Sequence, residues 1–118
     1  MIVAGFGFRE GATLASLQGA LAGARPGLIA TAAAKADHPA FRALAEALAV
    51  PTLAVAEEAL RQTLTLTESA ASRAAHGAGS VAEAAALVAA GPGASLLGPR
   101  AVSHDRMATC ALAKRTTP

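Results

Sequence analysis

The chain has 118 residues, enough for one compact domain around one hydrophobic core. It contains 35 alanines and a single cysteine, so an intrachain disulfide is excluded and the usual zinc ligand sets cannot be assembled. Ten Lys and Arg against eight Asp and Glu leave a net charge of +2, and Tyr and Trp are absent, which argues against a nucleic-acid-binding surface.

Membrane attachment is not expected either. Every run without Gly, Pro or a charged residue is shorter than the ~20 residues needed to span a bilayer. The first eight residues lack a basic leader and run into Arg9 and Glu10. We therefore expect a cytoplasmic protein without a membrane anchor.

Short apolar runs alternate with longer alanine–leucine segments, a pattern that predicts interleaved strands and helices. A first buried strand is expected at 2–6, followed by a glycine-rich turn over 5–11 and a helix over 13–22. The chain then predicts a strand at 28–31, a helix beginning at Pro39, a strand at 52–55 and a short helix at 57–63.

The second half is predicted to begin with an irregular, functional loop over 65–79. Ser80 and Glu83 match a capping box at the start of a helix over 80–90. Two extended segments, 95–103 and 107–114, read as a hairpin, and Cys110 within it is expected to be a buried small hydrophobe.

Glycines precede two of the predicted helices, and both places are candidate anion sites. Gly5 and Gly7 lie before the first of these helices, and Gly79 before the second. Exposed backbone N–H groups at a helix start favour anions. Arg9 and Lys35 would add cations there, Lys35 at the carboxyl edge of a parallel sheet.

Each of these features also has a structural interpretation. The first glycine segment could be a tight turn with a solvated arginine, and Lys35 could be a solvated surface lysine. A dinucleotide site is poorly supported, because the glycine spacing is one residue too long and no suitable acidic residue follows. Phe6 or Phe8 could form part of an apolar floor or belong to the core.

Catalytic candidates are few. Glu83 is most simply the capping partner of Ser80, with a role as general base as the alternative. Glu68 lies beside Ser69, where a carboxylate next to a hydroxyl could orient water. The three histidines lie in separate loops without a second ligand at i+3 or i+4, so no metal site is expected; His76 is of interest because glycines follow it.

Four stretches of sequence carry a family resemblance: VAGFGFR at 3–9, AKADHP at 34–39, TLTES at 65–69 and GSVAEAAAL at 79–87. Together with the terminal segment at 107–113 they resemble the family formed by CobE and the C-terminal domain of CbiG, proteins of cobalamin biosynthesis. The resemblance implies one three-layer α/β/α domain over 1–118, with a mixed, mainly parallel sheet and a C-terminal hairpin.

The resemblance also implies a function. It implies binding of a precorrin or corrinoid intermediate and contact with other enzymes of the pathway, with no cofactor; the longer CbiG proteins open a lactone in such an intermediate. A non-catalytic carrier and a partner-binding domain are the alternatives. The positions that match the family pattern, and carry over as pocket candidates, are Gly5, Gly7, Arg9, Lys35, Ser69, Gly79, Ser80, Val81 and Glu83. The residues predicted to bind the ligand are Gly5, Gly7, Phe8, Arg9, Lys35, Ser69, Gly79 and Ser80.

Overall fold

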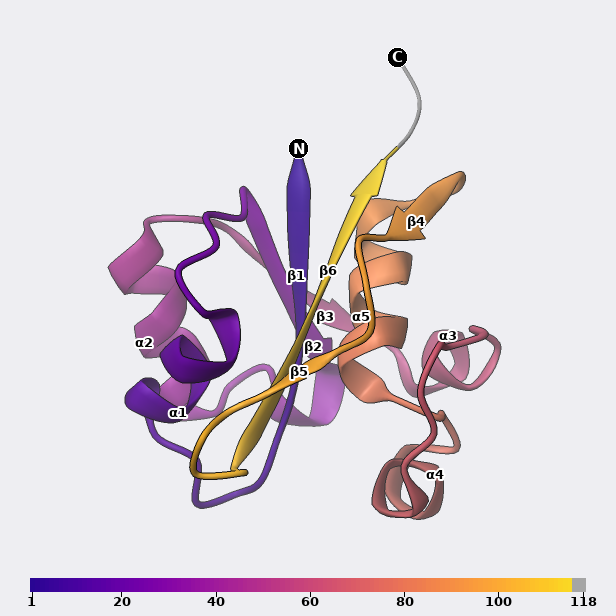
Figure 1. Cartoon of the computed structure of the whole chain (residues 1–118), viewed down its shortest axis with the longest axis horizontal. Helices are drawn as coiled ribbons and strands as arrows, with labels where there is room; N and C mark the ends of the chain where they lie inside the picture. Colours follow the sequence, from indigo (N-terminus) through magenta and orange to yellow (C-terminus); the bar gives the residue numbers. More distant parts are fainter. Residues whose placement is uncertain (116–118) are drawn as a thin grey trace.

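A six-stranded sheet lies between two layers of helices in the computed structural model, which describes residues 1–115 (Figure 1). The strands are β1 (Ile2–Phe8), β2 (Leu28–Ala32), β3 (Thr52–Val55), β4 (Ala94–Leu96), β5 (Ala101–Val102) and β6 (Ala108–Arg115). The helices are α1 (Leu14–Leu21), η1 (Ala33–Lys35, a 3₁₀ turn), α2 (Pro39–Leu48), α3 (Glu57–Arg61), α4 (Ala70–His76) and α5 (Val81–Ala90).

The sheet is mixed, as predicted. Its order is β3-β2-β1-β6-β4, with β5 paired to β6. Strands β1, β2 and β3 are parallel, whereas β6 runs antiparallel to β1, β4 and β5. The predicted C-terminal hairpin is present, with its first arm divided into β4 and β5. As a result, the carboxyl ends of the three parallel strands and the beginning of β6 meet at one edge of the sheet.

The two faces of the sheet are packed differently. Helices α1 and α2 cover one face with large side chains, among them the fully buried Leu17, Phe41 and Leu44. Helix α5 covers the other face almost entirely with alanine. It can approach this closely because Gly5 has no side chain: a Cβ there would lie 2.1 Å from the Ala82 carbonyl oxygen.

The glycine-rich turn predicted over 5–11 is partly wrong, because β1 continues as a strand to Phe8 and the turn is confined to the residues after it, at Glu10 and Gly11. Residues Ile2 to Phe8 all pair with β6, from Ile2 opposite Lys114 to Phe8 opposite Ala108. This continuous ladder satisfies the backbone groups of Gly5 and Gly7 in extended conformation, and it outweighs their preference for turns.

The predicted irregular loop over 65–79 is also partly wrong, since it contains α4. Ser69 caps this helix: its hydroxyl oxygen accepts a hydrogen bond from the Ser72 N–H at 3.2 Å. Gly77, with φ of 70°, ends it in the left-handed conformation. No residue of α4 is buried, so the helix lies on the surface.

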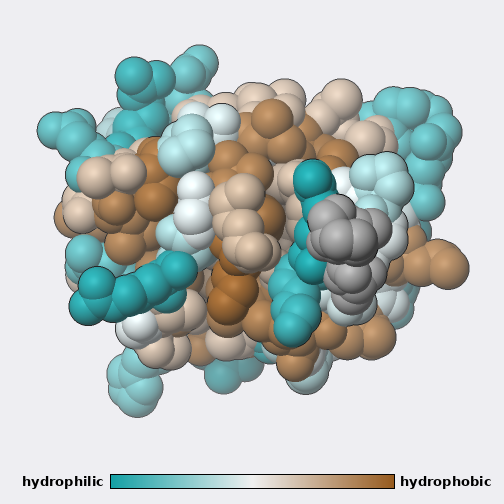
Figure 2. All heavy atoms as spheres, turned by 90° about the horizontal axis from the view of Figure 1, so that it is seen from above, coloured by the Kyte–Doolittle hydropathy of each residue, from teal (hydrophilic) through white to brown (hydrophobic). Residues whose placement is uncertain are grey.

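One end of the molecule is the end at which β1 begins, opposite the edge where the three parallel strands finish. Its surface has hydrophobic atoms across the middle and hydrophilic side chains around them (Figure 2). Within residues 1–115, none of the helices combines the length and apolar character that crossing a membrane requires.

Candidate functional site

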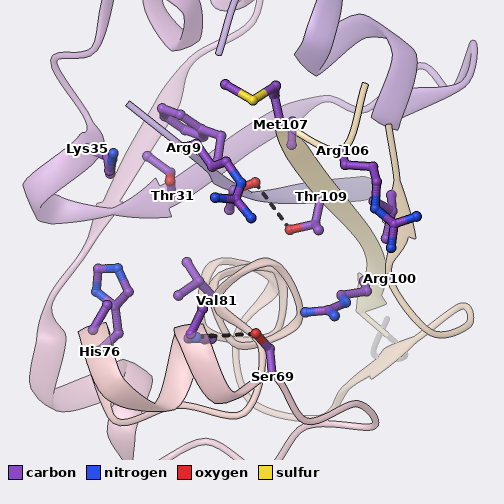
Figure 3. A pocket seen from close by; sticks show the side chains of 17 residues that line it. Arg9, Thr31, Lys35, Ser69, His76, Val81, Arg100, Arg106, Met107 and Thr109 are labelled. Atoms are coloured by element: carbon purple, nitrogen blue, oxygen red, sulfur yellow. Dashed lines mark hydrogen bonds between the residues drawn. The ribbon is translucent and has the colours of Figure 1, made fainter. Parts of the chain in front are cut away.

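A pocket of about 430 Å³ opens at the edge where β1 and β2 end and β6 begins. Ligand-binding pockets of small domains usually have this size and lie at this edge of α/β sheets. Figure 3 shows Arg9 in the middle of the pocket, with His76 and Lys35 on one side and Arg100 and Arg106 on the other. Four separate parts of the chain therefore supply the lining.

The lining carries four cationic side chains and, within residues 1–115, no carboxylate. Lys35 is the one that forms an ion pair, with its Nζ 3.0 Å from Glu10 Oε2 and 5.5 Å from the centre of the Phe8 ring. Its hydrogen bond lowers the pKa of Glu10. The guanidinium groups of Arg9, Arg100 and Arg106 have no ion-pair partner in the described part of the chain. Such a concentration of unpaired positive charge favours anionic ligands.

Helix α4 forms one wall of the pocket, and His76 ties this wall to α3. The His76 Nδ1 atom lies 2.7 Å from Glu57 Oε1, and the histidine side chain keeps 18% of its surface exposed. In the same wall, the Ser72 hydroxyl is buried without a hydrogen-bond partner among residues 1–115. The wall thus offers the pocket polar groups as well as alanine methyl groups.

Glu83 is fully buried and holds two loops beside the pocket. Its Oε1 accepts a hydrogen bond from the Thr67 N–H at 2.8 Å, and its Oε2 accepts one from the Arg100 N–H at 2.9 Å. The predicted capping box is therefore only half correct. Ser80 Oγ does accept a hydrogen bond from the Glu83 N–H at 3.2 Å, but the Glu83 carboxylate binds the two loops instead of the Ser80 N–H.

Glu68 lies on the surface, where its Oε2 forms an ion pair of 2.9 Å with the Arg73 guanidinium. Donation from Arg73 lowers the pKa of Glu68. Neither Glu68 nor Glu83 is among the residues that line the pocket.

The structure brings five of the eight predicted binding residues together at the pocket: Gly7, Phe8, Arg9, Lys35 and Ser69. The other three lie behind it. Gly5 packs against α5, and Gly79 and Ser80 are buried at the start of that helix, whose first residue, Val81, lines the pocket. Thus the two glycine-containing segments reach one shared cavity.

Sequence reasoning missed Arg100 and Arg106, which come from the segment before β6. The antiparallel pairing of β6 with β1 carries this segment to the pocket, where the Arg9 N–H donates to the Met107 carbonyl at 2.9 Å. The Thr109 hydroxyl likewise donates to the Gly7 carbonyl at 3.2 Å (Figure 3). The available signal was the predicted hairpin, whose two extended segments leave residues 104–106 between them as its turn, but the position of that turn in space depended on strand pairing.

Asp105 holds the turn that presents Arg106. Its carboxylate accepts hydrogen bonds from the hydroxyls of Ser103 and Ser16, both at 2.6 Å, and from the Met107 N–H at 3.0 Å. These donors, that of Ser103 above all, lower the pKa of Asp105 to about 2. The Ser16 contact also joins the turn to the start of α1.

We expect Asp105→Asn to lower the urea midpoint at neutral pH, because an amide cannot accept all three hydrogen bonds. The folded-state pKa is depressed below the ordinary value of 3.8, so this contribution is present above that value. It is lost as pH falls through about 2, and the urea midpoints of the wild type and the variant should then converge. Urea unfolding at several pH values measures this. The exposed Asp37→Asn is the matched control, and a stability difference independent of pH would contradict the assignment.

The described residues contain no group of three or more His, Cys, Asp and Glu side chains that could hold a metal ion. Cys110 is buried in β6, as predicted, and burial raises the pKa of its thiol to about 12. It therefore acts as a small hydrophobic side chain.

The model of the cobalamin synthesis G C-terminus family matches residues 2–113. The crystal structure of CobE, a protein from the cobalamin (vitamin B12) biosynthetic pathway, is 33% identical to this chain with a TM-score of 0.86; the match covers 100% of this chain and 92% of that one. The cobalamin biosynthesis protein chiG from Agrobacterium tumefaciens is also 33% identical, with a TM-score of 0.75 and coverage of 99% and 100%.

A cobalamin biosynthesis protein G homolog from Sulfolobus solfataricus shares the fold at 21% identity and a TM-score of 0.71. That match covers 95% of this chain and 36% of the other. No curated protein matches the chain in sequence.

Proposed function

Because this chain belongs to the cobalamin synthesis G C-terminus family and is a protein of the cobalamin biosynthesis pathway, we propose that its pocket binds a precorrin or related corrinoid intermediate. The observation that carries the proposal is a lining that contains Arg9, Lys35, Arg100 and Arg106 and, among the described residues, no carboxylate. A precorrin is a large ring with carboxylates around its edge. Several separate cations around one opening match that distribution of charge.

The apolar part of the lining supports the same proposal. Phe8, Val81, Val102 and Met107 line the pocket between the cationic groups. The ring system of a precorrin has a broad apolar face, which these side chains can contact while the cations bind its carboxylates. Backbone N–H groups play a smaller part than the sequence suggested, because those of Gly79 and Ser80 lie behind Val81.

The finer form of the proposal is hydrolytic opening of a lactone on the bound ring. The pocket supplies cations that would stabilise a developing oxyanion. The second candidate function is a carrier that binds the intermediate and passes it to another enzyme of the pathway. It is favoured by the positions of Glu68 and Glu83, the two carboxylates predicted as bases, outside the lining.

The test is to titrate the protein with a corrin polycarboxylate and to measure binding from the change in the absorption spectrum of the ligand. Arg9→Ala and Lys35→Ala should each weaken binding by about 1–3 kcal/mol, the usual contribution of a charged hydrogen bond. Arg25→Ala is the matched control, because Arg25 is exposed in the loop before β2, at the opposite end of the sheet.

A corrin in which the carboxylates are converted to amides should bind more weakly than the acid. Equal affinity for the two ligands would show that the cations do not recognise the acidic edge. Unchanged affinity in both the Arg9 and Lys35 variants would remove these two side chains from the site.

A further inference from the structure

His76 is placed in the pocket as an oriented group with one nitrogen available. It is the one histidine among the lining residues in the described part of the chain. Its Nδ1 is hydrogen bonded to the Glu57 carboxylate at 2.7 Å, which fixes the ring. Its Nε2 has no partner within residues 1–115. The other histidine with a side-chain role, His38, uses both nitrogens, toward the Glu10 carbonyl and the Ala40 N–H.

We propose that His76 is the acid–base group for hydrolysis of an ester or lactone in a polycarboxylate ligand held in this pocket, and that Glu57 is its positioning residue. This inference rests on the proposed function for the presence of the ligand. The geometry that carries it is a half-buried histidine with a carboxylate behind it and a cationic lining around it.

Glu57 sets the chemical form of the imidazole. A carboxylate can only accept at this contact, so Nδ1 carries the hydrogen, and in the neutral imidazole Nε2 then presents its lone pair. A neutral imidazole in this form can take a proton from water. The Glu57 carboxylate then stabilises the positive charge of the imidazolium that results, as in other histidine–carboxylate pairs.

The step balances without a further reactant. Water attacks the lactone carbonyl while His76 Nε2 takes one of its protons, and the negative charge on the tetrahedral oxygen is met by a lining guanidinium or ammonium group. The ring C–O bond then breaks, and His76 returns the proton to the departing alkoxide. The products are a hydroxyl and a carboxylic acid, which ionises and releases one proton to solvent.

The charged neighbours of His76 come from several elements. Glu57 contacts it from α3, and Arg61 of the same helix lies beside Gly77, the next residue along the chain. Lys35 lies on the same side of the pocket from η1, and Arg73 precedes His76 on α4. Arg61 and Arg73 are paired with Glu58 and Glu68, respectively. Glu57 is thus the carboxylate in direct contact with the imidazole.

The probe for the test is isocitric lactone, a small dicarboxylate lactone whose opening is followed by NMR. The protein should accelerate opening over buffer. His76→Ala should reduce kcat by about 100-fold or more, the usual contribution of an acid–base group, with little change in KM. Imidazole added to His76→Ala should restore part of the rate. His104→Gln is the control, because His104 is exposed and does not line the pocket.

Glu57→Gln separates positioning from simple structural support. We expect kcat to fall by about 10-fold while KM stays unchanged, as for other residues that orient a histidine. Urea unfolding of the same variants checks that they are folded. An unchanged rate in His76→Ala, or no rescue by imidazole in folded protein, would overturn the inference.

The outcomes for the two proposals are distinguishable. If the protein binds a corrin polycarboxylate but does not accelerate opening of the lactone, the acid–base inference is wrong and the binding function stands. If it binds no corrin polycarboxylate, the proposed function fails, and the inference fails with it.

Discussion

Gly5→Val should prevent α5 from packing on the sheet. The added Cβ would lie 2.1 Å from the Ala82 carbonyl oxygen and 2.4 Å from the Ala86 nitrogen. Both are backbone atoms of a helix, so neither can rotate away, and the whole helix must move. We expect the free energy of unfolding to fall by about 3 kcal/mol or more, at the upper end of the cost of overpacking. Urea unfolding monitored by circular dichroism measures the loss.

The matched control is Gly98→Val, at a partly buried glycine with open space beside its Cα. A Cβ on Gly98 would have no atom within 4 Å, and the residue does not need the left-handed conformation. Its substitution should change stability by less than about 0.5 kcal/mol. Similar unfolding curves for the two variants would show that the close approach of α5 to β1 is not what requires glycine at position 5.

Glu83→Ala is expected to have an effect of similar size for a different reason. The change removes the acceptor for the N–H groups of Thr67 and Arg100. Each buried donor left without a partner costs about 1–3 kcal/mol. The expected loss in the free energy of unfolding is therefore about 2–6 kcal/mol, again measured by urea unfolding.

Glu46→Ala is the control for this substitution, because Glu46 lies on α2, is exposed and has no ion pair within residues 1–115. Glu83→Gln should fall between the wild type and the alanine variant, since one amide oxygen can still accept. If the glutamine variant is as stable as the wild type, the two loops do not depend on a carboxylate. Loss of the Glu83 carboxylate should also change the shape of the pocket, because one of the two loops that it holds carries Arg100.

Some parts of the fold could be predicted from local patterns. Pro39 at the first position of α2 and Ser80 as the cap of α5 each determine a helix start through contacts within a few residues. The strand Thr52–Val55 was predicted with its observed bounds. Helix α4 was missed although its signals, Ser69 before it and Gly77 after it, are equally local. Its short length and exposed alanines gave no apolar periodicity to recognise.

The candidate site was predictable only in part. Arg9 and Lys35 follow parallel strands, and the carboxyl ends of such strands lie at one edge whatever the rest of the chain does. Arg100, Arg106 and the contact of His76 with Glu57 could not be found in the same way. They join segments whose distance depends on the pairing of β6 and the docking of α4.

The amino-acid sequence by itself determined the alternation of strands and helices, the helix caps and the cations after two strands, because these depend on neighbours close along the chain. Only the tertiary structure decided that Gly5 and Gly7 lie in a strand and that Glu83 bridges two loops. It also decided that the start of β6 completes the pocket. These features depend on backbone hydrogen bonds and burial between residues far apart in the chain, which no local pattern encodes.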